Sequence, residues 1–156
     1  MTVLTKYILT FLMSMVPVIE LRGAVPFGVG MDLPLLPVLI VSVVGNMLPV
    51  PFIALFIRRI FAFLRRRSLR LDALVTKIED RARKKARKIK KYETLGLFIL
   101  VAIPLPGTGA WTGALVGALL NIRLKWLLPA IFAGVVTAGV IMSILTYGAG
   151  ALIGLV

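Results

Sequence analysis

The chain alternates long uncharged apolar runs with short interruptions rich in charge, glycine and proline. A helix that crosses a bilayer needs about 20 apolar residues, because the hydrocarbon core is about 30 Å thick and a helix rises 1.5 Å per residue. The first run, Tyr7–Ile19, would rise only about 20 Å. It therefore predicts a half-helix that ends inside the membrane.

The next segment carries charge at membrane depth. Glu20–Gly28 places a carboxylate, a guanidinium, two glycines and a proline between apolar runs, which predicts a broken tip followed by a short return to Gly30. A turn is expected around Asp32, because prolines at positions 34 and 37 disfavour helix at and before those positions. Pro37–Ile57 then has the length of a full span.

A basic segment separates the two halves of the chain. Between Arg58 and Lys91 lie 15 of the 19 basic residues and 3 of the 6 acidic ones. This segment is expected to form a helix with an apolar face and an opposite face of Arg and Lys. It is therefore expected to lie along an anionic membrane surface on the cytoplasmic side. Nucleic acid is not an expected partner, because few aromatic residues are interleaved. The apolar positions recur every three or four residues, as in an amphipathic helix: Leu71, Leu74, Val75, Ile78, Ala82, Ala86 and Ile89.

The second half repeats the pattern of the first. Thr94–Ile103 is a ten-residue run, about 15 Å long if helical, and Pro104–Gly109 predicts a second broken tip. Ala110–Ile122 is expected to return to the membrane edge. A full span follows from Trp126, whose indole is an expected interfacial anchor.

The two halves are predicted to be inverted repeats. Gly23-Ala24 aligns with Gly109-Ala110 at an offset of 86 residues. A cytoplasmic segment between the halves makes the first hairpin enter from outside and the second from inside, as in many secondary transporters. We predict an all-α integral membrane protein forming one domain over residues 1–156. Repeat one covers 7–57, the cytoplasmic basic helix 58–93, and repeat two 94–156, in a multi-pass cell-membrane arrangement.

Composition narrows the function. The chain is 60% hydrophobic with a mean hydropathy of +1.02, more apolar surface than a soluble domain of 156 residues could bury. Cys and His are absent from the sequence, which removes thiol nucleophiles, disulfides and His-based metal sites or bases. With Asp32 the one Asp near a membrane segment, an aspartyl pair is also missing. We expect no enzyme, no metal and no cofactor.

Three motifs carry a family resemblance: ELRGAVP at 20–26, GNMLPVPF at 45–52 and IPLPGTGAWTGA at 103–114. Together they resemble the signatures of the small multidrug export protein family, in order and over essentially the whole chain. That family is more distantly similar to the DedA superfamily. The resemblance to the family implies drug export. The resemblance to the superfamily implies two inverted re-entrant loops and proton-dependent transport or flipping of lipids such as undecaprenyl phosphate. It also implies arginines near the second tip. That tip has none here, and Arg123 is the nearest.

Glu20 and Arg22 are the leading candidate residues. In an extended tip alternate side chains share a side, so the two would face each other. One interpretation makes Glu20 a proton-carrying carboxylate whose protonation releases Arg22 to hold a substrate anion such as phosphate. The other is that the pair is neutralised and simply pins the loop.

Further candidates lie around the second tip. The start of Ala110–Ile122 would offer free amides to an anion, or the tip is only a tight hairpin. Gly109, Gly113 and Gly117 predict close helix packing, and Asn46 is expected to hydrogen-bond a tip. The substrate or proton candidates are Glu20, Arg22, Gly23, Pro26, Asn46, Pro104, Pro106, Gly107, Thr108, Gly109 and Arg123.

The sequence thus predicts a membrane transporter, proton-coupled, with its site between the two tips. The cargo would be a small amphipathic compound or an anionic lipid. The alternative is a non-transporting scaffold whose basic helix binds anionic lipid or partners. Anionic membrane lipids are the expected partners, and a homodimer is expected because two copies would give four tips and a larger enclosed path.

Overall fold

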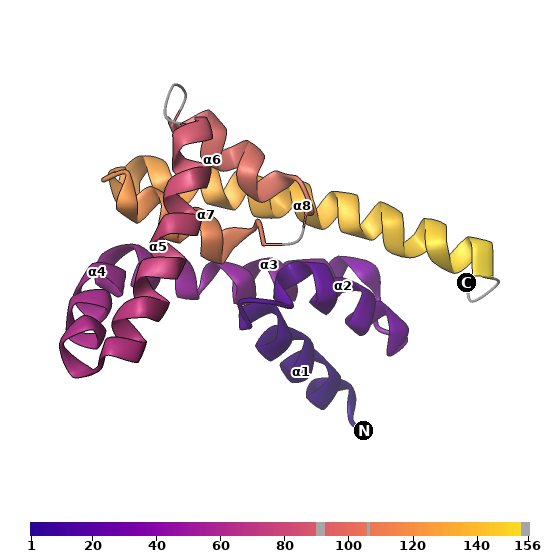
Figure 1. Ribbon diagram of the computed structural model, residues 1–156. Coiled ribbons are helices and arrows are strands. Elements are labelled where there is room, and N and C mark those ends of the chain that lie inside the picture. Colours follow the sequence, from indigo (N-terminus) through magenta and orange to yellow (C-terminus); the bar gives the residue numbers. More distant parts are fainter. Residues whose placement is uncertain (90–92, 106, 154–156) are drawn as a thin grey trace.

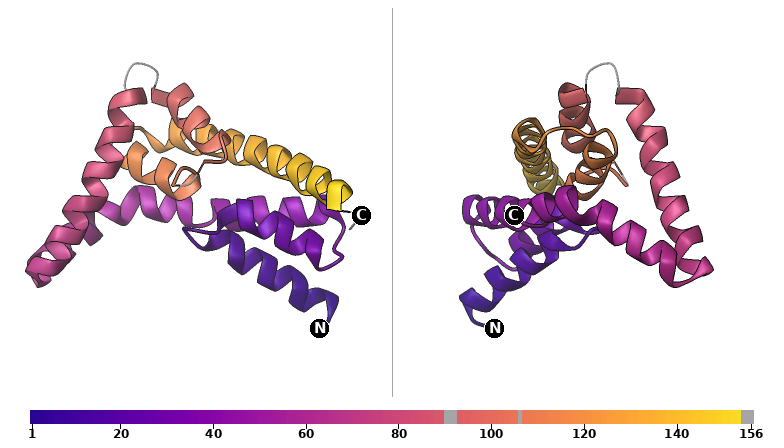
Figure 2. Two further views of the ribbon diagram at one scale, coloured as in Figure 1. Left: turned by 45° about the vertical axis from the view of Figure 1, so that its right-hand side comes forward. Right: turned by 90° about the vertical axis from the view of Figure 1, so that its left-hand side faces the viewer.

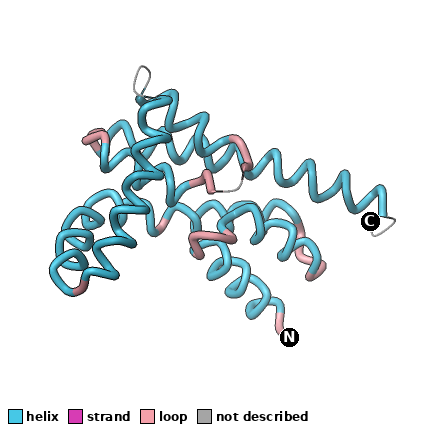
Figure 3. Tube along the Cα trace, viewed as in Figure 1, coloured by secondary structure: helices cyan, strands magenta, loops and turns pink. Residues whose placement is uncertain are grey.

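The computed structural model describes residues 1–89, 93–105 and 107–153, and in those residues it is helical with no strand (Figures 1 and 3). This confirms the all-α prediction. The helices are α1 (Val3–Met15), α2 (Glu20–Gly30), α3 (Leu35–Met47), α4 (Pro49–Arg67), α5 (Leu69–Ile89), α6 (Glu93–Ala102), α7 (Ala110–Leu119) and α8 (Leu124–Ile153).

The two halves share one order of elements. α1, a break, α2, a turn and α3 in the first half correspond to α6, a break, α7, a turn and α8 in the second. Each turn contains a residue in the left-handed region, Asp32 at φ 60° and Asn121 at φ 58°. In Figure 1 the indigo-to-purple first half lies below the orange-to-yellow second half, and α8 packs along α2 and α3. The inverted relation of the halves stays a prediction.

The first break lies earlier than predicted. Glu20–Gly28 is not a broken tip but most of helix α2, and the non-helical residues are 16–19. Pro17 explains the position, because proline has no N–H and disfavours helix in the residue before it. Pro26 lies inside α2 and removes one donor, yet α2 continues to Gly30. One proline in the middle therefore does not end the helix.

The predicted span Pro37–Ile57 begins earlier and is divided. α3 starts at Leu35, directly after Pro34, and Leu48 separates it from α4. Pro49 and Pro51 are in the first turn of α4, where a missing N–H breaks no helical hydrogen bond. Together α3 and α4, Leu35–Arg67, are still long and apolar enough to cross a membrane, and so is the segment Leu124–Gly148 of α8.

The basic segment is not the single helix that was predicted over 58–93. α4 continues to Arg67, Ser68 is extended, and α5 turns back at an angle that Figure 2 shows clearly. Val75 and Ala82 are buried, and α5 packs against α4 and α7. The apolar stripe is thus confirmed at these two positions, where it covers protein, whereas Leu74 is exposed. The side chains of Ala86 and Ile89 lie outside the described ones. The end of the segment, 90–92, lies outside the described residues.

The second half follows the prediction closely. α6 ends at Ala102, residues 103–105 and 107–109 are not helical, and α7 begins at Ala110. A Cβ on Gly113 would overlap the side chain of Val101 in α6, and one on Gly117 would overlap Leu127 in α8. The predicted close packing of this glycine face is therefore confirmed. Pro106 lies outside the described residues.

The buried core lies where α2, α6, α7 and α8 meet. Its members include Leu21 and Val25 from α2, Val101 from α6, and Leu127 and Ile131 from α8. Large apolar side chains are also exposed on the outer faces of α1, α3, α4 and α8. Such surfaces are suited to hydrocarbon rather than water. The fold therefore leaves the polar groups at the two breaks as the candidate site.

Candidate functional site

Glu20 caps the break of the second half. Its side chain is 3% exposed, and its Oε1 accepts the backbone N–H of Trp111 at 3.3 Å. Trp111 is in the first turn of α7, where the helix dipole favours a negative charge. A Cβ on Gly109, which has φ 125°, would overlap the carboxylate. Glycine is thus required for Glu20 to approach.

The backbone of Glu20 is itself unusual. It has φ 50°, in the left-handed region that costs a residue with a Cβ about 1–2 kcal/mol. Such conformations persist where the surroundings fix them, and they gather at functional sites. Here the strain is at the first residue of α2, where the chain leaves the 16–19 break and directs the carboxylate toward α7.

Arg22 holds the other side of the same break. Its guanidinium donates to the carbonyl of Leu105, to the carbonyl of Ile103 at 3.2 Å and to the hydroxyl of Thr108 at 2.8 Å. These acceptors follow the C-terminus of α6, where the dipole favours a positive charge. Glu20 and Arg22 therefore match the charge of the two helix ends that the second break exposes.

Glu20 and Arg22 point into the same region between α2 and the second break, but they do not pair with each other. The predicted extended tip is wrong, because residues 20–28 belong to helix α2. Among the described residues Glu20 forms no ion pair. The anion predicted at the start of α7 is supplied by the protein, because the carboxylate of Glu20 accepts an amide there.

Two further residues complete this set of helix-end contacts. The indole N–H of Trp111 donates to the carbonyl of Met15, the last residue of α1, at 3.0 Å. Arg58 donates to the carbonyls of Ala118 and Leu119 at the C-terminus of α7. Neither was among the predicted site residues. Trp111 lies within a recognised motif, but no local pattern indicates that its partner is 96 residues away.

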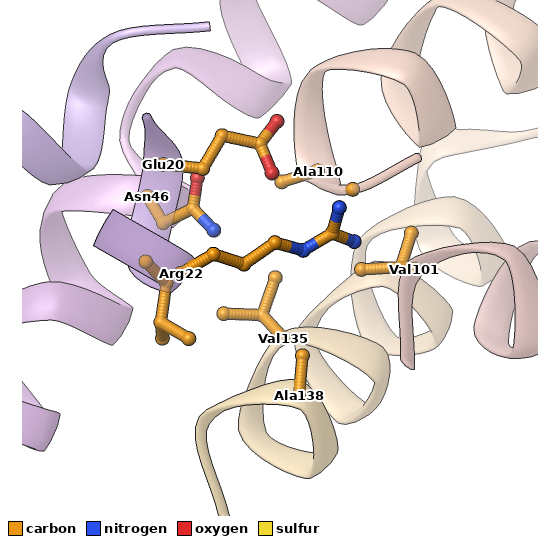
Figure 4. Close-up of a pocket in the computed structure, with 9 residues that line it drawn as sticks. Glu20, Arg22, Asn46, Val101, Ala110, Val135 and Ala138 are labelled. Atoms are coloured by element: carbon orange, nitrogen blue, oxygen red, sulfur yellow. The ribbon is translucent and has the colours of Figure 1, made fainter. Parts of the chain in front are cut away.

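A small cavity of about 10 Å³ lies between the two halves, next to these contacts. Figure 4 shows Glu20, Arg22 and Asn46 reaching toward it. Asn46 is 3% exposed, and its Oδ1 has no hydrogen-bond partner. The predicted hydrogen bond between the Asn46 amide and a tip is therefore not formed through this oxygen. The volume is near the least that can hold one water molecule. The other lining residues are Leu21, Val101, Gly109, Ala110, Val135 and Ala138.

The remaining candidates lie apart from the cavity. Gly23 packs closely on Ile19, where a Cβ would overlap its side chain. Arg123 is exposed in the turn before α8 and does not line the cavity. Pro26 and Pro104 shape the backbone of α2 and of the second break without lining it. The carbonyl of Gly107 accepts from the hydroxyl of Thr112 at 3.1 Å and from Lys85.

The described residues contain no group of three or more His, Cys, Asp or Glu that could hold a metal ion. The polar chemistry of the cavity is a carboxylate, a guanidinium and a free amide oxygen, all near helix ends. Of these groups the carboxylate can take up or release a proton, and all three can form or break hydrogen bonds.

Comparison with known families gives one match. The family model described as "putative small multi-drug export protein" matches residues 20–141, from Glu20 into α8. The matched region thus includes both charged residues of α2 and the whole second break. Comparisons with curated proteins and with solved structures found no match. Because the family match covers well over half of the chain, and the apolar helices fit a membrane location, this chain belongs to the small multi-drug export protein family of membrane proteins.

Proposed function

We propose that this chain is a proton-coupled membrane transporter in which Glu20 takes up the proton and the two helix breaks move relative to each other. The family description supports a role in export. The observation that carries the coupling is the buried carboxylate of Glu20, which shares a cavity with the partnerless Oδ1 of Asn46. Ionisable groups at membrane depth are functional candidates because they are costly to keep there.

Protonation would change what Glu20 can bond to. The ionised carboxylate only accepts hydrogen bonds, and it accepts one from Trp111. The protonated form has lost its attraction to the helix dipole and has gained an O–H donor. The free Oδ1 of Asn46 is an acceptor for that donor in the same cavity. Proton uptake therefore transfers a bond from α7 to α3 and loosens the contact between α2 and α7.

Loosening this contact frees the second break on one side only. A charge at a helix end contributes about 0.3–1 kcal/mol, and up to about 2 kcal/mol when partly buried. Arg22 remains on the carbonyls of Ile103 and Leu105, so α6 stays fixed while α7 is released. A path between the halves then opens at the breaks, in the manner of transporters built from discontinuous helices. The cargo is a small amphipathic compound or an anionic lipid.

The test is transport into liposomes that contain the purified protein, with ethidium as the amphipathic probe and a fluorescent phosphatidylglycerol as the lipid probe. Rates are measured with and without a pH gradient. We expect the gradient to raise the wild-type rate, and Glu20→Gln to remove that dependence. Asn46→Leu, which removes the acceptor, is expected to weaken it. The matched control is Asp32→Asn, because Asp32 is exposed and asparagine also accepts its left-handed φ of 60°.

The outcomes separate the parts of the proposal. A gradient response that survives in Glu20→Gln would remove Glu20 as the coupling group. Equal loss in Asp32→Asn would show that the effect is general. If wild-type protein moves neither probe, and Glu20 and Arg22 variants lose only stability, the chain is a scaffold and the transporter proposal is wrong.

A further inference from the structure

A second hollow lies outside the cavity, between α5 and the start of α7. It is a groove of about 490 Å³, and Figure 1 shows α5 crossing beside α7 where it lies. One wall is basic, with Arg81, Lys84 and Lys85 from α5. Lys85 reaches the carbonyl of Gly107 in the second break. The rest of the lining is Ile78, Ala82, Gly107, Thr112 and Leu115.

The positive charge of this groove is only partly balanced by nearby carboxylates. None of the described residues that line it is acidic. On α5, Glu79 pairs with Arg65 at 3.1 Å and with Arg83 at 3.4 Å, and Asp80 lines a neighbouring groove. Arg81 and Lys84 line both grooves, so the carboxylate of Asp80 neutralises part of their positive charge. Lys85 lines only the first.

Lys85 is also close to a second cation. Burial, and then the positive charge of Arg22, hold the pKa of Lys85 below its usual value. Like charges near each other are unfavourable. Arg22 has the carboxylate of Glu20 beside it, whereas no acidic residue lines the groove next to Lys85. A negatively charged group in the groove would remove that repulsion and would also accept from Thr112.

We propose that this groove binds the phosphate-bearing head of an anionic amphiphile, held by Lys85, Arg81 and Lys84. Phosphate suits clustered cations better than one carboxylate does, because it offers several strong acceptor oxygens. The apolar wall formed by Ile78, Ala82 and Leu115 suits the first carbons of a hydrocarbon chain. A free phosphate ion would gain nothing from that wall, so the occupant is a lipid-like anion.

The site gives the proposed transporter a substrate class and an entry point. It rests on the proposed function for this role, while binding itself does not depend on transport. The carbonyl of Gly107 accepts from Lys85, so an anion that attracts Lys85 weakens this contact with the second break. The head group would then lie beside Thr112, in the first turn of α7, next to the break that Glu20 caps.

Binding can be measured on purified protein in neutral detergent by native mass spectrometry and equilibrium dialysis. The probe is dioctanoyl phosphatidate, compared with dioctanoylglycerol and with inorganic phosphate. We expect Lys85→Gln to weaken phosphatidate binding about tenfold, as the loss of one charge-assisted contact. The matched control is Lys77→Gln, since Lys77 is also on α5 but lines the neighbouring groove. That variant should change binding less than about twofold.

Three results would overturn the site. Equal weakening by Lys77→Gln and Lys85→Gln would mean general attraction to a basic helix. If inorganic phosphate binds as tightly as phosphatidate, the groove is a site for the free ion. If dioctanoylglycerol binds as tightly as phosphatidate, the phosphate group does not contribute to binding. Measuring phosphatidate binding to the Glu20→Gln variant tests the groove independently of proton coupling, because binding in the groove does not require Glu20. Lys85-dependent binding in protein that transports nothing would retain the groove and reject the transporter.

Discussion

Replacing Arg22 by methionine should destabilise the fold more than any other single charge removal in α2. The guanidinium donates to two carbonyls after α6 and to the hydroxyl of Thr108. A hydrogen bond from a charged group contributes about 1.5–3 kcal/mol net. The three bonds share one side chain, and Thr108 remains within 2.9 Å of Ile103 O and 2.8 Å of Leu105 O. We therefore expect a loss of about 2–4 kcal/mol rather than the full sum.

The free energy of unfolding can be measured by titrating sodium dodecyl sulfate into mixed micelles. Tryptophan fluorescence is a suitable signal, because Trp111 contacts both Glu20 and the end of α1. Arg22→Lys tests geometry at constant charge. One ammonium cannot reproduce the planar fork of the guanidinium, so it should recover less than half of the loss.

Arg123→Met is the control for removing an arginine from this chain. Arg123 is exposed and does not line the cavity, so its loss should cost under about 0.5 kcal/mol. The reasoning fails if Arg22→Met and Arg123→Met cost the same, or if Arg22→Lys restores full stability. Either result would mean that Arg22 contributes only charge and does not hold the break.

Four further predictions concern other residues of the chain. Gly109→Ala should destabilise by more than about 2 kcal/mol and slow transport, because its φ of 125° is strained for alanine and its Cβ would displace the capping carboxylate. Gly148→Ala, with no atom within 4 Å of the new Cβ in α8, should instead stabilise by up to about 1 kcal/mol. Trp111→Phe should cost about 1 kcal/mol in the same unfolding titration, since the carbonyl of Met15 loses its donor. For Lys85 the lowered pKa means that the folded state releases its proton first, so stability should rise with pH toward about 10.5, and Lys85→Gln should lack this rise when unfolding is measured across that range.

Much of the helical plan could be predicted from run length and proline position. The second break, its flanking helices and the turn at Asp32 all follow from local signals that act within a few residues. The first break differs from the prediction because the prediction treats the charges of Glu20 and Arg22 as an interruption of the helix. A charged residue does not end a helix, whereas the missing N–H of Pro17 does favour an end.

The contacts of the site could not be predicted in the same way. Glu20 bonds to a residue 91 positions later, and Arg22 to residues 81 to 86 positions later. The sequence predicts that the two face each other, because alternate side chains of an extended tip share a side. The partners of Glu20 and Arg22 depend on how α2 packs against the second half of the chain. A pattern read from a single sequence contains no information about that packing.

Glu20 and Arg22 contact opposite sides of the second break. Both side chains reach toward the same cavity from the start of α2, as Figure 4 shows. The carboxylate contacts the start of α7, while the guanidinium contacts the residues that follow α6. The break leaves amides unpaired on one side and carbonyls on the other, and in a membrane such groups cost several kcal/mol each when no partner is present. A carboxylate and a guanidinium from the first half supply partners of the right sign to each. Of these two contacts only the carboxylate can change charge by taking up a proton, so a proton signal can release α7 without releasing α6.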